Sequence, residues 1–271
     1  MTILAGVIGD PIAQSRSPRL HGHWLARYGI DGQYVPLHVR PDDLAETLHL
    51  LPRLGFAGVN VTIPHKEAVF ALADERTARA EAAGAANTLV FRGGRIMADN
   101  TDGLGFVASV QQGAPNWQMD RPALLLGAGG AARGIVAGLL AAGLPEVVVA
   151  NRTADKAAAL ADLFPGRVRA VPWDRAPDAL GGIGLLANTT SLGMTGQPPL
   201  EFALDHLPPE AVVTDIVYAP LRTPLLDRAA ARGHATVDGL GMLLHQAAPG
   251  FEAWFGQMPE VDDALRAAVL A

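Results

Sequence analysis

Cysteine is missing from all 271 residues of the chain. This absence excludes disulfides, thiolate metal sites and a cysteine nucleophile. Histidine ligand sets are lacking too, because His21 and His23 would point to different faces of a helix and no HExxH sequence occurs. We therefore expect no metal site.

The chain also has no long apolar run and no cluster of basic residues. The glycine- and leucine-rich region after residue 123 is interrupted by Arg133, Pro145 and Glu146, well short of the roughly 18 apolar residues that span a bilayer. Residues 3–9 have no basic flank and indicate a strand rather than a signal peptide. With a net charge of −6, the chain has no excess of cations for a phosphate backbone. We expect a cytoplasmic protein that binds neither nucleic acid nor membranes.

Short apolar runs alternate with longer amphipathic stretches, which is typical of an α/β fold with parallel strands covered by helices. We expect strands at residues 3–8, 33–38, 58–62, 87–91 and 95–98, the last two joined by a turn at Gly93-Gly94. A helix should begin near Pro18, with Ser17 as its cap. From residue 123 the order strand, glycine turn, helix, strand repeats to Val237, as in a doubly wound unit.

This order and the chain length predict two domains, since a domain holds roughly 100 to 200 residues. Residues 103–238 should form a Rossmann-type doubly wound domain. Residues 1–102 should form an N-terminal α/β domain, and the mostly helical tail, residues 239–271, is expected to pack back onto it. The sequence leaves the oligomeric state open, a homodimer included.

A glycine-rich turn follows the predicted strand at residues 123–126. The turn comprises Gly127, Ala128, Gly129, Gly130 and Ala131, and an apolar helix comes next. Glycines there permit a tight turn and let a pyrophosphate approach the backbone amides at the helix start. The alternative is a close-packed turn without a ligand. The strand-to-helix context favours dinucleotide binding.

The end of the next strand discriminates between NAD and NADP. An acid there would bind the ribose hydroxyls of NAD, but the chain has Asn151, Arg152 and Thr153, with Lys156 shortly after. Arginine can bind a 2′-phosphate through two parallel hydrogen bonds and can stack on adenine. The alternative is that Asn151 and Thr153 only cap the next helix and Arg152 is solvated. We predict NADP.

Polar side chains follow strands of the N-terminal domain. Thr62 and Lys66 lie where a buried-looking strand ends, and Asp102 lies where the first domain ends. Sites in parallel sheets are built at such strand ends. We expect Lys66 and Asp102 to face each other there.

Several further motifs occur in order along the chain. They are Ser15-Arg16-Ser17-Pro18, residues 60–66, Gly84-Ala85-Ala86-Asn87-Thr88, Asn100-Thr101-Asp102, the glycine turn, Asn151-Arg152-Thr153, Asn188-Thr189-Thr190 and residues 238–246. With these motifs the chain resembles the shikimate dehydrogenase family over nearly its whole length. Lys156 stands where arginine is common in that family, which keeps the charge and loses the planar fork.

The resemblance implies reversible reduction of 3-dehydroshikimate to shikimate by NADPH, within aromatic amino-acid biosynthesis. The N-terminal domain would then bind the substrate and residues 103–238 would bind NADP. Nicotinamide supplies the hydride, so the protein has to orient the reactants and move a proton. We expect Lys66 to donate that proton and Asp102 to orient and stabilise it.

The resemblance also assigns binding residues. Ser15 and Ser17 are expected to hold the substrate carboxylate with Tyr218 nearby, and the ring hydroxyls should contact Thr62, Asn87, Asp102 and Gln246. On the nicotinamide side we expect Thr189, Ile216, Gly239 and Met242. Alternatives stay open: Ser17 as a helix cap, Asn87 as a strand-end turn and Gln246 as a solvated position. The sequence gives no role for His65.

Two other functions compete with this interpretation. One is a relative that prefers quinate or uses NAD, since one ring hydroxyl is a subtle matter of pocket contacts. The other is a catalytically silent NADP-binding module, which would have no reason to retain Lys66 and Asp102.

Overall fold

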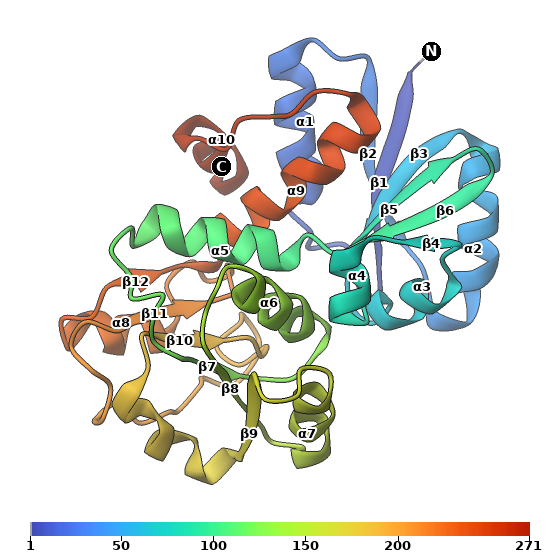
Figure 1. Cartoon of the computed structure of the whole chain (residues 1–271). Helices are drawn as coiled ribbons and strands as arrows, with labels where there is room; N and C mark the ends of the chain where they lie inside the picture. Colours follow the sequence, from blue (N-terminus) through green and yellow to red (C-terminus); the bar gives the residue numbers. More distant parts are fainter. Residues whose placement is uncertain (1) are drawn as a thin grey trace. The chain divides into compact units, whose positions relative to one another are not determined.

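The computed structural model describes residues 2–271, and the chain divides into two compact units, each an α/β assembly around a six-stranded sheet (Figure 1). The first unit is Met1–Gly105 with Leu243–Ala271, and the second is Phe106–Met242. Both boundaries fall inside helices, α5 (Asp102–Gly113) and α9 (Gly239–Phe255). No break in the apolar pattern marks such a boundary in the sequence.

The sheet of the first unit is mixed rather than parallel throughout. Its strands run in the order β2 (Gly32–His38), β1 (Ile3–Gly9), β3 (Phe56–Val61), β5 (Thr88–Arg92), β6 (Arg95–Asp99) and β4 (Glu75–Arg76). Strand β5 is antiparallel to both β3 and β6. The turn between β5 and β6 has two glycines at φ 59° and 77°, the left-handed conformations of a tight hairpin turn. The two-residue strand β4 is too short to leave a sequence pattern.

Helices cover both faces of this sheet. On one face lie α2 (Leu44–Leu50) and α3 (Lys66–Leu72), whose apolar side chains share a core with Ile8, Val59 and Val61. The alternate residues of β3 point to the other face, where Asn60 accepts a hydrogen bond from Tyr34. The remaining α-helices of the unit are α1 (Ser17–Tyr28), α4 (Ala78–Ala83), α10 (Asp263–Leu270), the first residues of α5 and the second part of α9, and two short 3₁₀ helices lie at Pro41–Asp43 and Pro52–Leu54.

An aromatic cluster fixes the C-terminal tail to the first unit. Trp254 of α9 donates from its indole nitrogen to the carbonyl oxygen of Leu89 at 3.0 Å. A Cβ at Gly58 would lie 2.1 Å from that same indole nitrogen, so only glycine fits there. Phe251 packs edge-on against Trp24 of α1, with ring centres 5.2 Å apart. The tail is therefore part of the first unit's core.

The sheet of the second unit is parallel throughout, as the sequence predicts. The order is β12 (Thr236–Val237), β11 (Val212–Asp215), β10 (Leu185–Asn188), β7 (Ala123–Leu126), β8 (Val147–Asn151) and β9 (Val168–Pro172). The chain starts at the central β7, builds outward to β9, then returns to build the other half. This reversal is the Rossmann topology, and it leaves a binding crevice at the carboxyl ends of β7 and β10.

Two separate cores cover the faces of this sheet. Leu125 of β7 points into a core with α5, α6 (Gly130–Ala141) and α7 (Ala154–Asp162). Leu124 and Leu126 point into a core with the 3₁₀ helix η3 (Trp173–Gly182) and α8 (Pro224–Ala231). Continuous burial of β7 on both faces explains its unbroken apolar sequence.

The predicted repeat of strand and helix fails in one half of the sheet. A 3₁₀ helix replaces the α-helix between β9 and β10, and residues 189–211, between β10 and β11, contain no helix. That segment carries two Pro-Pro pairs, at 198–199 and 208–209, which deny a helix its backbone donors. Apolar side chains of the loop cover the sheet instead; they are Leu200, Phe202, Leu204 and Leu207.

Within residues 2–271, no helix has the length and apolar character needed to cross a membrane. The same residues contain no group of three or more histidine, aspartate or glutamate side chains arranged to hold a metal ion.

The buried His21 should make stability depend on pH. Its ring stacks on Tyr34 at 3.9 Å, and burial lowers its pKa from 6.5 to about 3, an effect that the Asn60 amide only partly offsets. Below pH 6.5, His21 therefore binds a proton in the unfolded chain and stays neutral in the folded chain until the pH approaches 3. The stability that the neutral ring contributes is complete above pH 6.5 and is lost as the pH falls toward 3, by about 1.4 kcal/mol per pH unit.

We expect His21→Phe to flatten the dependence of the unfolding free energy on pH between 6.5 and 4, measured by urea titration. The comparison concerns the slope, so a repacking cost common to all pH values does not affect it. His49→Gln, at an exposed position, is the control and should leave the slope unchanged. Identical slopes for His21→Phe and the parent chain would contradict the assignment.

Candidate active site

One edge of the first unit's sheet gathers most of its predicted site residues. Strands β1 and β3 are parallel and in register at Ile8 and Val61, so the segments that follow them leave the sheet at the same edge. Strand β5 begins at this edge and β6 ends there, because Thr88 pairs with both Asn60 and Asp99. The edge therefore brings together residues 15–17, 62–66, 87 and 100–102.

Lys66 and Asp102 form an ion pair at this edge. Lys66 is the first residue of α3 and Asp102 the first of α5. The Lys66 Nζ donates to Asp102 Oδ2 at 2.5 Å, and the side chains are 15% and 5% exposed. The pair is thus largely withdrawn from water, with the lysine the more accessible partner. An ammonium held in this way can deliver a proton to a group that binds beside it.

The Asn87 side chain organises the groups around this pair. Its Nδ2 lies 2.9 Å from Asp102 Oδ1, 3.0 Å from Gln246 Oε1 and 3.0 Å from Thr101 Oγ1. Its Oδ1 accepts from the backbone nitrogen of Thr101 at 2.8 Å. Asn87 is 2% exposed. The alternative of a solvated Gln246 is wrong, because this contact and a bond from its Nε2 to the Leu243 carbonyl hold it in place.

The residues before Asp102 support it from the backbone side. The Asn100 Oδ1 accepts from the backbone nitrogen of Asp102 at 3.1 Å, and its Nδ2 donates to the Ala85 carbonyl. Thr101 Oγ1 donates to the Gln246 carbonyl at 2.7 Å. The sequence marked this motif but gave no role to Asn100 or Thr101. Both are buried and fix the start of α5.

The two serines precede α1 on the segment that follows β1. Ser15 is half-buried, and its Oγ accepts from the backbone nitrogen of Ser17 at 3.3 Å. The expectation that Ser17 caps α1 is wrong: Arg16 holds the cap position with helical backbone angles, and the helix already includes Ser17. Thr62 directly follows β3 and is half-buried.

His65 has a structural role that the sequence did not reveal. Its ring is 1% exposed, and its Nε2 lies 2.7 Å from the carbonyl oxygen of Val39. Because a carbonyl only accepts, this nitrogen carries the proton. The bond fixes the residue before Lys66 to the segment after β2.

The glycine turn of the second unit joins β7 to α6 as predicted. Gly127 has φ 117°, and a Cβ there would lie 2.6 Å from Thr189 Oγ1, so both conformation and space require glycine. Gly129 is the N-cap of α6, and a Cβ there would meet nothing within 4 Å. Gly130 and Ala131 form the first turn of the helix, whose amides can face an anion.

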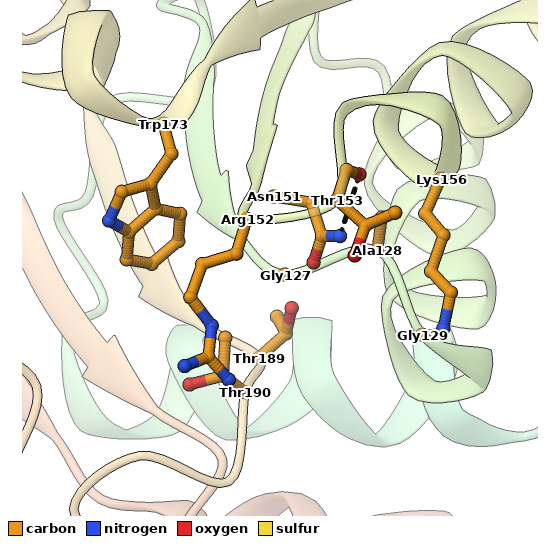
Figure 2. A pocket seen from close by; sticks show the side chains of 10 residues that line it. All are labelled: Gly127, Ala128, Gly129, Asn151, Arg152, Thr153, Lys156, Trp173, Thr189 and Thr190. Atoms are coloured by element: carbon orange, nitrogen blue, oxygen red, sulfur yellow. Dashed lines mark hydrogen bonds between the residues drawn. The ribbon is translucent and has the colours of Figure 1, made fainter. Parts of the chain in front are cut away.

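A pocket of about 250 Å³ opens at the carboxyl ends of β7, β8 and β10 (Figure 2). Its lining comprises Gly127, Ala128, Gly129, Asn151, Arg152, Thr153, Lys156, Trp173, Thr189 and Thr190. None of these ten described residues is acidic, and two of them, Arg152 and Lys156, are cationic. The donor set therefore fits a polyanionic nucleotide.

The alternative that Asn151 and Thr153 serve only as helix caps receives little support. Thr153 holds the N-cap position of α7, but its side chain makes no capping hydrogen bond. The Asn151 Nδ2 donates to the Thr153 carbonyl at 2.9 Å and so shapes the turn instead. Trp173 and Thr190, which the sequence analysis did not select, complete the lining.

Five predicted cofactor residues lie outside that pocket lining: Gly130 and Ala131 in the first turn of α6, and Ile216, Gly239 and Met242, which lie together. A Cβ at Gly239 would lie 2.4 Å from the Ile216 carbonyl oxygen, so the two backbones are in close contact. Met242 is 9% exposed in the core against which Ile216 packs. Tyr218 follows in the segment after β11, and it makes interactions within the structure.

A buried carboxylate holds together the chain segments at the strand ends beside the pocket. The sequence analysis missed it. Asp215 closes β11 and is fully buried. Its Oδ1 accepts from Asn188 Nδ2 and the Val217 backbone nitrogen, both at 3.0 Å, and its Oδ2 accepts from Thr223 Oγ1 at 2.8 Å. Burial raises its pKa from 3.8 to about 6, although these three donors favour the charged form.

The Asn188 side chain links Asp215 to the pocket lining. Its Oδ1 accepts from the backbone nitrogen and the hydroxyl of Thr190, at 3.0 and 2.7 Å. Asp215 therefore fixes one wall of the pocket through Asn188. An acid at the end of a short, valine-rich strand was the available sequence signal.

Comparisons with known proteins find the same family in three successive parts of the chain. Residues 7–89 match the family model described as "Shikimate dehydrogenase substrate binding domain", residues 110–191 match "Shikimate / quinate 5-dehydrogenase", and residues 239–269 match "Shikimate 5'-dehydrogenase C-terminal domain". The chain is 60% identical over 270 residues to "Shikimate dehydrogenase (NADP(+))" of Paracoccus denitrificans, covering 99% of this chain and 96% of that one.

Solved structures resemble the whole chain. A shikimate 5-dehydrogenase from Thermus thermophilus, in complex with NADP(H) and shikimate, is 37% identical with a TM-score of 0.88, covering 100% of this chain and 99% of the other. A quinate dehydrogenase from Corynebacterium glutamicum, in complex with NAD, is 32% identical with a TM-score of 0.92, covering 99% of both chains.

The buried charge of Asp215 should lower the stability of the folded protein at neutral and alkaline pH. Its folded pKa lies above the unfolded value, so the cost of burying its charge appears as the pH rises from 3.8 through 6. Asp215→Asn keeps the shape: its Oδ1 can accept from Asn188 and Val217, and its Nδ2 can donate to Thr223. We expect the variant to be more stable than the parent at pH 8, by about 3 kcal/mol at most, and to gain nothing below pH 4.

The measurement is the unfolding free energy of both proteins from urea titrations across this range. Asp120→Asn makes the same charge change at an exposed position and should show no such pH dependence. A constant difference between Asp215→Asn and the parent from pH 4 to 8 would show that Asp215 does not titrate as described.

Proposed function

Because the chain belongs to the NADP-dependent shikimate dehydrogenase family, we propose that it reversibly reduces 3-dehydroshikimate to shikimate with NADPH, using Lys66 and Asp102 as its catalytic pair. The observation that carries the catalytic assignment is the withdrawn ion pair between these two side chains. A second buried network, around Asn87, holds the carboxylate in place.

The chemistry divides between cofactor and protein. When bound, NADPH supplies the hydride. Lys66 Nζ donates a proton to the substrate oxygen as negative charge develops on it, and accepts that proton in the reverse direction. Asp102 Oδ2 orients the ammonium by accepting its hydrogen bond. The Asn87 amide, bonded to Asp102 Oδ1, keeps the carboxylate from rotating away.

The hydroxyl, amide and carboxylate groups at the same sheet edge suit a polyhydroxylated ring. We assign the ring hydroxyls to Thr62, Asn87, Asp102 and Gln246, and the substrate carboxylate to Ser15 and Ser17. Tyr218 near the carboxylate stays a prediction from the family resemblance.

NADP is the cofactor, and its recognition follows from the pocket. We assign the pyrophosphate to the backbone of residues 127–131 and the 2′-phosphate to Arg152, Thr153 and Lys156. A neutral amide, Asn151, ends β8 where NAD-binding folds carry an acid. Thr189, Ile216, Gly239 and Met242 are assigned to the nicotinamide side.

The second candidate is a quinate dehydrogenase or an enzyme with relaxed cofactor choice. Its basis is the similar fold of the quinate dehydrogenase described above, which was solved with NAD. The two cations and the lack of an acid among the described pocket residues favour NADP. A silent binding module is disfavoured by the intact Lys66–Asp102 pair.

Absorbance at 340 nm tests the function directly. Purified protein is offered shikimate or quinate, each with NADP or NAD. We expect clear preference for shikimate with NADP, since Arg152 and Lys156 can bind a 2′-phosphate. Preference for quinate or NAD would establish the second candidate. No turnover with folded protein in any combination would refute the enzyme assignment.

Lys66→Ala tests the proton donor. Because general acid–base catalysis contributes about 10²- to 10⁴-fold, we expect kcat to fall by at least 100-fold while the Kd for shikimate changes only a few-fold. Lys156→Ala is the matched control, because the same truncation in the cofactor pocket should raise the KM for NADP and largely spare kcat. Turnover of Lys66→Ala within tenfold of the parent would refute the assignment.

A further inference from the structure

Trp173 differs from the other three tryptophans of the chain. Trp24, Trp117 and Trp254 are 0%, 6% and 5% exposed, whereas Trp173 is only half-buried. It directly follows the edge strand β9 and opens η3. Part of the indole packs against the core below, and the rest lines the nucleotide pocket.

The pocket separates flat groups from a point charge. Figure 2 shows the indole of Trp173 and the guanidinium of Arg152 on one side of the pocket, and the Lys156 side chain on the other side, beside Gly129. Arg152 follows β8 and Trp173 follows β9, which are neighbouring strands. Two planar side chains thus come from adjacent strand ends.

This arrangement matches the two chemical parts of an adenosine 2′-phosphate. A purine is a flat aromatic system that stacks on indole and guanidinium, whereas a phosphate requires cations and N–H donors. We propose that Trp173 is a nucleotide-affinity residue whose indole stacks on the adenine of the cofactor. The inference rests on the proposed NADP site and adds a residue outside its glycine turn and basic segment.

A purely structural Trp173 makes a different prediction. If the indole only covered the core under η3, truncating it would lower stability and leave nucleotide affinity unchanged. If it stacks on adenine, it contributes equally to any ligand with that base, whether or not a 2′-phosphate is present. Arg152 should behave differently, because its charge favours the 2′-phosphate.

The experiment titrates the full-length protein with adenosine 2′,5′-bisphosphate and with 5′-AMP, using calorimetry and tryptophan fluorescence. We expect both nucleotides to quench the fluorescence of the parent. The change should come from Trp173, because the other three tryptophans are buried in cores. In Trp173→Leu the quenching should vanish and the Kd for both nucleotides should rise by about tenfold, the scale of base stacking on an aromatic ring. Trp173→Phe should retain most of the affinity.

Arg152→Ala is the comparison variant. It should lose more affinity for the bisphosphate than for 5′-AMP. The proposal is overturned if Trp173→Leu binds the bisphosphate within twofold of the parent. It is also overturned if Trp173→Phe, which keeps a ring, loses as much affinity as the leucine variant at unchanged melting temperature. These titrations need no turnover, so failure of the dehydrogenase assay and failure of the stacking proposal are separate results.

Discussion

The hydrogen bonds of the Asn87 amide set the geometry of the first unit's polar edge. Its nitrogen has two hydrogens but lies within 3.0 Å of three acceptors, contributed by Thr101, Asp102 and Gln246. These acceptors come from the start of α5 and from α9, so one amide joins chain segments that are distant in sequence. Because the acceptors outnumber the hydrogens, one contact can yield to a substrate oxygen without leaving the amide unsatisfied.

The two candidate sites differ in their chemistry. The pocket of the second unit relies on charge, with Arg152 and Lys156 near the helix amides and no acid among the described lining residues. The sheet edge of the first unit relies on neutral amides and hydroxyls around one compensated ion pair. A polyanionic cofactor and a hydroxylated ring call for such different surroundings.

The sequence reveals features that follow from local chemistry. The apolar run at residues 123–126, the glycines after it and the basic segment after β8 have direct physical meaning, and the structure places them as predicted. Trp173 and Asp215 escaped because their roles depend on neighbours from other strands. The antiparallel pairing of β3 with β5 and the helix-free segment 189–211 escaped for a related reason, because strand pairing and the cover of a sheet face are decided by the whole fold.

Lysine is almost unused in this chain. Lys66 and Lys156 are its only two lysines, and the other 19 of its 21 lysine and arginine residues are arginines. One lysine belongs to the ion pair and the other lines the pocket of the second unit. Lysine labelled with an isotope at a single side-chain position would therefore give an NMR spectrum with two signals, one from each unit. Each site thus carries its own spectroscopic reporter, and the ionisation of Lys66 can be followed directly without altering a single residue.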